Sequence, residues 1–188
     1  MILNKKTALI IGAGGCLGQA IAKAYARAGA ALIVADLNHQ AAVQTLKAVG
    51  KRIGGVALQV DVSDTTASSQ LVDNVIDRFG RLDILVNCAA ICLVDALLEL
   101  TPERWDSVFV VNARGAFFCM QAAAKVMIPQ KFGRIINVST PASRMAFPNF
   151  ASYAASKAAL DSDLPPRTSP PSKLDLEPLT WPGKLYQA

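Results

Sequence analysis

Residues 7–18 read TALIIGAGGCLG, a short apolar run that meets a loop containing four glycines. A helical pattern follows this loop and stops at Gly29. Strand, glycine loop and helix in this order allow backbone amides at a helix N-terminus to hold a pyrophosphate, because glycine keeps side chains away from the phosphates. The stretch therefore predicts a dinucleotide-binding site. A tight turn without a ligand is the alternative.

The second predicted strand, residues 31–35, runs directly into Asp36. A carboxylate at this point accepts hydrogen bonds from both hydroxyls of an adenosine ribose and repels a 2′-phosphate. Neither Gly15 in the loop nor Leu37 after Asp36 offers a basic group for such a phosphate. The pattern favours NAD over NADP as the cofactor, and the alternative is that Asp36 only begins the next helix.

The rest of the chain alternates strands and helices. Strands are predicted at 55–60, 84–86 and 134–138, and helices at 40–49, 65–79, 101–127 and 150–160. Such alternation without hairpin signals predicts an α/β fold with a doubly wound, Rossmann-like parallel sheet. Ligands in these sheets bind beyond the carboxyl ends of the strands. Polar candidates follow those ends at Asp36, Asp61, Asn87, Ser139 and Thr140.

Residues 152–157, SYAASK, place Tyr153 and Lys157 four positions apart on a predicted helix. Side chains with this spacing share one face, with their Cβ atoms about 5–6 Å apart. A phenol ordinarily has a pKa of about 10, and a neighbouring ammonium lowers it. The pair is therefore a candidate proton donor and acceptor. For an isolated pair, a packed tyrosine beside a solvated lysine is the alternative.

Three further motifs lie between the glycine loop and this pair. They are Asp61-Val62 after the third strand, NCAA at 87–90 after the fourth, and Asn112 in the long helix. Taken in order, the five motifs resemble the T-G-x-x-x-G-x-G loop, the adenine-contacting pair, the N-N-A-G segment, the helix asparagine and the Y-x-x-x-K of the short-chain dehydrogenase/reductase family. The resemblance covers residue 5 to about residue 160.

The resemblance implies hydride transfer between NAD and an alcohol or carbonyl substrate. Tyr153 would act as general acid or base, Lys157 would lower its pKa and bind the nicotinamide ribose, and Asn112 would position a water. The hydroxyl that orients the substrate oxygen is Thr140 by its spacing of 13 residues before Tyr153, with Ser139 as the alternate and Ser143 as a third option.

The cofactor-binding residues implied by the same motifs come from the glycine loop, from the residues that follow three strands, and from the catalytic pair. They are Gly12, Gly14, Gly15, Cys16, Leu17, Gly18, Asp36, Leu37, Asp61, Val62, Asn87, Ala89, Tyr153 and Lys157. The sequence departs from the family pattern at Ile11, Cys16, Cys88 and Ala90. We expect Cys16 to matter most, because its side chain would crowd the phosphates or require a tolerant backbone, and so to weaken NAD binding.

Composition excludes several other classes of function. The 188 residues carry a net charge of +5 in scattered positions, which does not predict a nucleic-acid-binding stripe. No run reaches 18 apolar residues and no signal peptide is evident, so we expect a cytoplasmic protein without a membrane span. Four cysteines and one histidine lack metal-ligand spacing, and we expect reduced cysteines and no metal.

The pattern changes abruptly after Leu160. Residues 161–188 contain six of the ten prolines and show no apolar periodicity, which predicts an irregular, proline-rich tail after a domain of residues 1–160. We interpret the chain as a truncated or frame-shifted relative that lacks the C-terminal strands of the family fold. The family's homodimer or homotetramer interface would then be compromised. A genuine interaction tail is the alternative, as are a non-catalytic dinucleotide-binding module and an inactive fragment.

Overall fold

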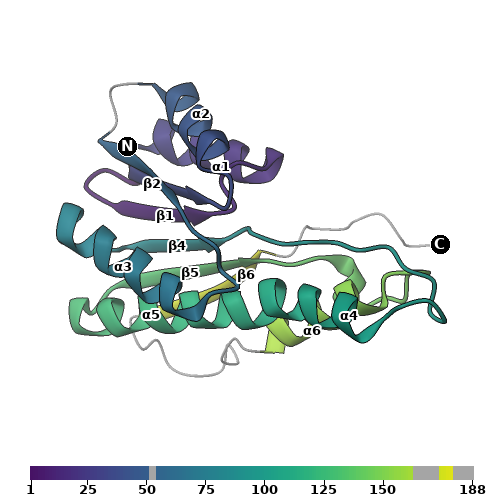
Figure 1. The fold of residues 1–188 in the computed structure, drawn as a ribbon. Helices are drawn as coiled ribbons and strands as arrows, with labels where there is room; N and C mark the ends of the chain where they lie inside the picture. Colours follow the sequence, from purple (N-terminus) through teal and green to yellow (C-terminus); the bar gives the residue numbers. More distant parts are fainter. Residues whose placement is uncertain (51–53, 163–173, 180–188) are drawn as a thin grey trace, which may run out of the picture.

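The computed structural model describes residues 1–50, 54–162 and 174–179, and these alternate strands with helices as predicted (Figure 1). The elements are β1 (Thr7–Ile11), α1 (Cys16–Ala28), β2 (Ala31–Asp36), α2 (His39–Val49), β3 (Gly55–Gln59), α3 (Thr65–Phe79), β4 (Ile84–Asn87), α4 (Pro102–Phe109), the π-helical turn η1 (Val110–Gly115), α5 (Ala116–Gln130), β5 (Gly133–Val138), the 3-10 turn η2 (Pro141–Ser143), α6 (Ala151–Ser162) and β6 (Leu174–Leu179).

The strands form one parallel sheet in the order β3-β2-β1-β4-β5-β6. The order reverses between β1 and β4, because the chain leaves β3 at one edge and returns on the other side of β1. Ligands of open parallel sheets bind at such a reversal. The predicted doubly wound, Rossmann-like sheet is therefore confirmed.

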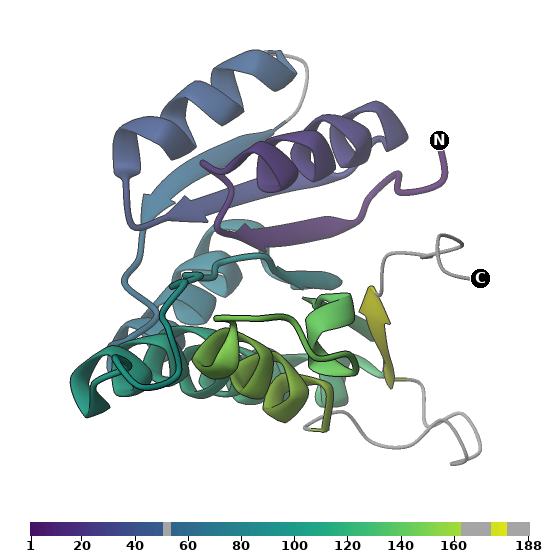
Figure 2. The ribbon, with the colours of Figure 1, turned by 90° about the vertical axis from the view of Figure 1, so that its right-hand side faces the viewer.

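Helices cover both faces of the sheet, and strand alternation decides which side chains meet them (Figures 1 and 2). In β1, Ala8 and Ile10 belong to the core beneath α1 and α2, whereas Leu9 and Ile11 belong to the core shared with α3 and α5. Successive residues of a strand point to opposite faces. The central strands are apolar on both sides for this reason, which agrees with their continuous apolar runs.

Close packing at the glycine loop explains two of its glycines. Gly12 has φ +82°, and a Cβ there would overlap the backbone of Ala89 after β4. A Cβ at Gly18, in the first turn of α1, would overlap the carbonyl oxygen of Gly12. Both positions therefore require glycine so that the loop, α1 and the segment after β4 can approach one another.

The buried carboxylate of Asp83 joins the opposite, amino ends of β1 and β4. It accepts hydrogen bonds from the Thr7 amide at 2.9 Å and from Arg81 at 2.7 and 2.6 Å, and Lys6 Nζ lies 3.2 Å away. Burial by itself raises the pKa of Asp83, but the donors Arg81, Thr7 and Lys6 together lower it below its ordinary value. The carboxylate is therefore held in its charged form.

The long helix predicted from Thr101 begins as expected. The Thr101 hydroxyl accepts a hydrogen bond from the Arg104 amide at 3.4 Å, and Pro102 occupies the first turn. Within the described ranges, Pro102–Gln130 is a helical run long and apolar enough to cross a membrane, and 44% of its most apolar window is buried inside the fold. A single helical run of this kind is weak evidence for a membrane segment, because the core helix of a globular domain can have the same length and composition.

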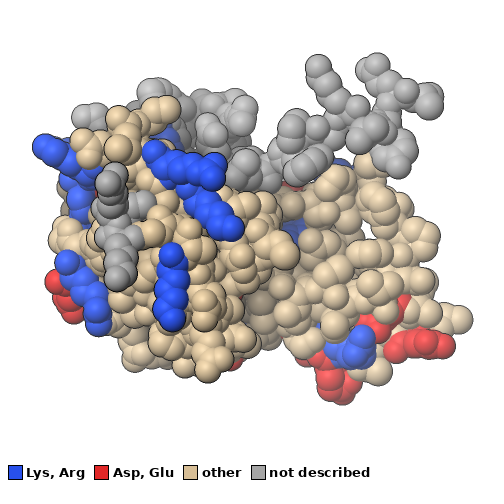
Figure 3. Space-filling view, turned by 90° about the horizontal axis from the view of Figure 1, so that it is seen from above, with Lys and Arg blue, Asp and Glu red and all other residues tan. Residues whose placement is uncertain are grey.

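Charged side chains are unevenly divided on the face seen in Figure 3. Lysine and arginine side chains stand over the half that holds α1 and α2, where Lys23, Arg27 and Lys47 are exposed, and acidic side chains gather at the other end. The scattered positions in the sequence therefore become a partial separation of charge on this face.

The C-terminal part differs from the prediction in two ways. Helix α6 continues to Ser162, and residues 174–179 form β6, which pairs in parallel with β5. An irregular tail throughout 161–188 was therefore wrong for these residues. Leucines at 174, 176 and 179 suit a strand, and an edge position tolerates Pro178 because one side of an edge strand needs no amide donor. The rest of the predicted tail lies outside the described residues.

Candidate functional site

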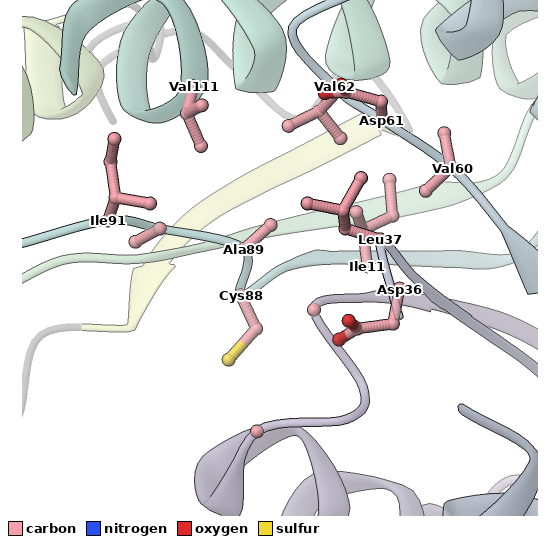
Figure 4. A pocket seen from close by; sticks show the side chains of 13 residues that line it. Ile11, Asp36, Leu37, Val60, Asp61, Val62, Cys88, Ala89, Ile91 and Val111 are labelled. Atoms are coloured by element: carbon pink, nitrogen blue, oxygen red, sulfur yellow. The ribbon is translucent and has the colours of Figure 1, made fainter. Parts of the chain in front are cut away.

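A cavity of about 350 Å³ opens where the strand order reverses, at the carboxyl ends of β1, β2 and β4 (Figure 4). Half of the predicted cofactor-binding residues line it: Gly12, Gly15, Asp36, Leu37, Asp61, Val62 and Ala89. The remaining wall is apolar apart from one thiol and was not predicted, and it consists of Ile11, Val60, Cys88, Ala90, Ile91 and Val111. Ile91 belongs to no motif and Val111 only precedes the predicted Asn112, so the fold brings both to the cavity.

Asp36 connects β2 to the glycine loop. Its Oδ2 accepts a hydrogen bond from the Gly14 amide at 2.8 Å, and its Oδ1 accepts one from the Asn38 amide at 2.9 Å. The side chain remains partly exposed, and Figure 4 shows the carboxylate beside the glycine loop. A carboxylate held in this way is available to accept further hydrogen bonds from a ligand that enters the cavity.

The N-terminus of α1 provides donors for an anion. Gly15 is the residue that caps the helix, and no side chain satisfies the first amides of α1. A Cβ at Gly15 would meet only the Gly12 carbonyl, at 3.7 Å, so the approach from the cavity is open. Unsatisfied amides and the helix dipole together favour a negative group here.

Cys16 is the first residue of α1 and is exposed. It is not among the residues with positive φ, so the prediction that this position demands a tolerant backbone was wrong. The physical reason is that the tight turn ends one residue earlier, and Cys16 already belongs to the helix. Leu17 is 49% exposed, whereas Gly18 is buried against the loop. Weaker NAD binding because of Cys16 stays a prediction.

Asn87 does not line the cavity, although it was predicted to contact the cofactor. Its side chain is buried and donates hydrogen bonds to Asn137 Oδ1 at 2.9 Å and to the Ala116 carbonyl at 3.4 Å. The Asn87 side chain therefore links β4, β5 and α5. The residues after it, beginning with Cys88, take the place beside the cavity.

Lys157 is only 2% exposed, and its ammonium donates a hydrogen bond to the Val138 carbonyl at 2.7 Å. Burial lowers its pKa to about 8, while the Cys88 thiol and the Asp161 carboxylate oppose this change. Helix α6 thus holds the lysine against the carboxyl end of β5.

The pKa of Tyr153 is raised above its ordinary value, which corrects the prediction that Lys157 lowers it. Burial is the main cause, Cys92 adds to it, and a hydrogen bond with the Thr140 side chain opposes it. Lys157 does not determine the direction of the Tyr153 pKa, because burial disfavours the charged form of the lysine and because its ammonium is directed to the Val138 carbonyl. In this state the phenol keeps its proton at neutral pH.

The structure distinguishes the three candidate hydroxyls. The Thr140 side chain lies close enough to Tyr153 to oppose the rise of its pKa, and it accepts a hydrogen bond from the Ala142 amide at 3.3 Å. Ser139 Oγ is buried without a hydrogen-bond partner among the described residues. Ser143 Oγ is already engaged by the Asp161 carboxylate. The geometry therefore favours Thr140 as the hydroxyl that acts with Tyr153.

Asn112 lies in the π-helical turn between α4 and α5 and is fully buried. Its Oδ1 accepts from the Ile91 amide at 2.9 Å, and its Nδ2 donates to the Ile91 carbonyl at 2.8 Å and to Ser156 Oγ at 3.1 Å. It therefore joins the segment after β4 to the helix that carries Tyr153. The sequence predicted this asparagine but not the π-helical turn, which is a frequent feature of functional sites.

Comparison with known proteins is consistent with this geometry. The family model described as short chain dehydrogenase matches residues 6–162. A sorbitol dehydrogenase from Cereibacter sphaeroides is 40% identical over 163 residues, and a 3-oxoacyl-[acyl-carrier-protein] reductase from Synechocystis sp. is 36% identical over 160 residues. These matches cover 86% and 84% of this chain, and 63% and 65% of the relatives.

The fold comparison leads to the same family. The structure of an NAD+-bound xylitol dehydrogenase is 31% identical and superposes with a TM-score of 0.82 over 86% of this chain and 63% of that one. The chain thus spans less than two thirds of the length of these relatives. Because the family model matches most of the chain and the sheet is shared with a solved relative, the chain belongs to the short-chain dehydrogenase family.

Proposed function

We propose that the chain is an NAD-dependent oxidoreductase that transfers a hydride between the nicotinamide and an alcohol or carbonyl substrate. One observation carries the proposal. The Cys88 thiol lines the cavity and lies within electrostatic reach of both Asp36 and Lys157. Asp36 lines the cavity, whereas Tyr153 and Lys157 do not, so Cys88 is the lining residue that connects the proposed ribose acceptor to the proposed catalytic helix.

The residues present fit a dinucleotide. Asp36 would accept the adenosine ribose hydroxyls, the uncapped N-terminus of α1 after Gly15 would hold the pyrophosphate, and Lys157 would bind the nicotinamide ribose. Bound there, the nicotinamide supplies or accepts the hydride. None of the described residues that line the cavity is basic, whereas Asp36 and Asp61 are acidic, which supports NAD over NADP.

The chain's own residues would handle the proton and the substrate oxygen. Tyr153 keeps its proton at neutral pH and is suited to donate it to a carbonyl oxygen in the reductive direction. Thr140, which lies beside Tyr153, would orient that oxygen. Lys157, with a pKa of about 8, carries its positive charge at neutral pH and would hold the nicotinamide ribose.

Polyols are the first substrates to test, because a sorbitol dehydrogenase and a galactitol 2-dehydrogenase from Agrobacterium fabrum are similar to this chain. Ketones and acyl thioester ketones belong in the same panel, because a 3-oxoacyl-[acyl-carrier-protein] reductase is also similar. Since the chain spans 63% of the first relative, its activity on any of these compounds is a proposal.

The test compares NADH and NADPH binding by calorimetry and then follows turnover of the panel. Two negative charges about 4 Å apart repel by about 1 kcal/mol even in water, so we expect roughly fivefold tighter binding of NADH than of NADPH. Asp36→Asn should reduce this preference. Tighter binding of NADPH by the unaltered chain would refute the cofactor assignment.

Turnover tests the catalytic tyrosine. Tyr153→Phe should abolish turnover and leave NADH affinity within about twofold, because the phenol oxygen is needed for proton transfer. Tyr25→Phe on α1 is the matched control, since Tyr25 is also partly buried but packs against the core between the sheet and helices α1 and α2. Retained turnover in Tyr153→Phe would refute the assignment.

A non-catalytic dinucleotide-binding module is the second candidate. It is favoured by the raised pKa of Tyr153 and by the direction of Lys157 toward Val138, because both leave the phenol without strong activation. NADH binding without turnover of any compound in the panel would support this second function over the first.

A further inference from the structure

Asp161 lies at the far end of α6, one helical turn beyond Lys157, and meets the loop that carries Thr140. Its Oδ2 accepts a hydrogen bond from Ser143 Oγ at 2.7 Å. Its Oδ1 is buried and has no hydrogen-bond partner in the part of the chain that the structure describes. A carboxylate in such a place is costly unless a nearby cation compensates its charge.

Ser143 connects this carboxylate to the Thr140 backbone. Its hydroxyl proton is shared between Asp161 Oδ2 and the Thr140 carbonyl oxygen, which lies 2.8 Å from Ser143 Oγ. The 3-10 turn Pro141–Ser143 closes the loop between these two contacts. One serine hydroxyl therefore links the Thr140 backbone to a carboxylate of α6, in addition to the contact of Lys157 with the Val138 carbonyl.

Lys157, one helical turn before Asp161 on α6, is the cation that would compensate this carboxylate. Residues four apart share a helix face, and the two charges attract without forming a direct ion pair. The titratable groups that act on Lys157 are Asp161 on its own helix and Cys88 after β4. Asp161 is the one carboxylate among these groups, and it favours the charged form of the lysine.

We infer that Asp161 is a positioning residue of the site, which acts through Ser143 on Thr140 and through its charge on Lys157. The inference rests on the proposed function as far as turnover is concerned. Asp161 sets the distance between the Thr140 loop and the helix that carries Tyr153 and Lys157. It also keeps the lysine charged when the tyrosine proton is transferred.

The test uses the full chain with Asp161→Asn, Ser143→Ala and Ser143→Thr. Ser162→Ala is the matched control, because Ser162 follows Asp161 on the same helix but is exposed and bonds only to the Ala158 carbonyl among the described residues. The first readout needs no turnover: the ε-amine of Lys157 is titrated by NMR on chain labelled at lysine, with Lys157→Met identifying its signal.

We expect the titration midpoint of Lys157 to fall in Asp161→Asn and to remain unchanged in Ser162→Ala. We expect kcat to fall by about 10- to 100-fold in both Asp161→Asn and Ser143→Ala, with KM changing less, because small displacements of a catalytic group have effects of this size. Ser143→Thr keeps the hydroxyl and should restore most of kcat. The pH at half-maximal kcat should move only in Asp161→Asn.

An unchanged Lys157 midpoint in Asp161→Asn would overturn the inference, as would equal kcat in Ser143→Ala and the unaltered chain. If Asp161→Asn does not fold, Ser143→Ala and its rescue by Ser143→Thr decide the question. If the unaltered chain shows no turnover, the proposed function fails, while the Lys157 titration still supports or overturns the charge coupling to Asp161.

Discussion

Replacing Asn112 by aspartate would make the stability of this fold depend on pH in a direction that the structure dictates. The change keeps the size of the side chain and the oxygen that accepts from the Ile91 amide. It removes the Nδ2 donor to the Ile91 carbonyl and to Ser156 Oγ. An ionised carboxylate would then face two oxygen atoms in a fully buried site.

The size of the effect follows from these three contacts. A protonated aspartic acid can still donate one hydrogen bond, so at low pH the variant loses one net bond, worth about 1 kcal/mol. An unpaired buried charge adds several kcal/mol, so the loss at pH 8 should be about 3–5 kcal/mol. Domains are stable by only about 5–15 kcal/mol, so this loss is easily measured.

The direction follows from proton linkage. Burial beside two acceptors raises the pKa of the new carboxyl in the folded state above its unfolded value of about 4. The folded state then binds more protons than the unfolded state between these two pKa values. Stability therefore falls as pH rises through this window and stays low above it.

The assay is urea unfolding followed by circular dichroism at pH 5 and pH 8. Asn74→Asp is the matched control, because Asn74 makes one hydrogen bond from an exposed position on α3 and should cost less than about 1 kcal/mol at either pH. A loss in Asn112→Asp that is equal at both pH values, or below about 1 kcal/mol at pH 8, would refute the reasoning.

Three further predictions concern the loop and the opposite end of the sheet. Gly12→Ala should destabilise the fold by more than about 1 kcal/mol and weaken NADH binding, since φ is +82° and the Cβ would overlap Ala89. Urea unfolding measures the stability and calorimetry the affinity for NADH, and an unchanged stability and affinity would contradict the packing argument. Asp83→Asn should make the free energy of unfolding less dependent on pH at acidic pH. The lowered folded pKa of Asp83 stabilises the fold above about pH 4, and this contribution disappears as pH falls through that pKa. Urea unfolding at pH 7 and pH 3 measures the difference, and an equally large loss of stability in the variant would be the contrary result. Cys16→Gly should tighten NAD binding in calorimetry if the exposed thiol crowds the phosphates, and equal affinity would end that hypothesis.

Local pattern predicted most of the secondary structure and the location of the cavity. The glycine loop, the capping residue Thr101 and the alternation of apolar runs each depend on residues near one another in sequence, so they could be interpreted without the fold. The same reasoning failed for β6, because an edge strand can form from a short proline-containing segment once a partner strand is present.

The proposed catalytic pair shows what local pattern could not predict. Spacing placed Tyr153 and Lys157 on one helix, but the direction of each pKa depends on burial and on groups that are distant in sequence, such as Cys92, Cys88 and Val138. Asn87 likewise belongs to a motif by its position, while its side chain serves a buried link to β5 because strand alternation directs it there.

The sequence by itself determined the family, the doubly wound sheet and the residue types available for binding and proton transfer, because these follow from periodicity and from motifs in order. Only the tertiary structure decided which hydroxyl meets Tyr153, which residues form the apolar wall, and that Asp161 and Ser143 tie the Thr140 loop to α6. These features rest on contacts between segments far apart in the chain, where packing and burial set both distance and charge.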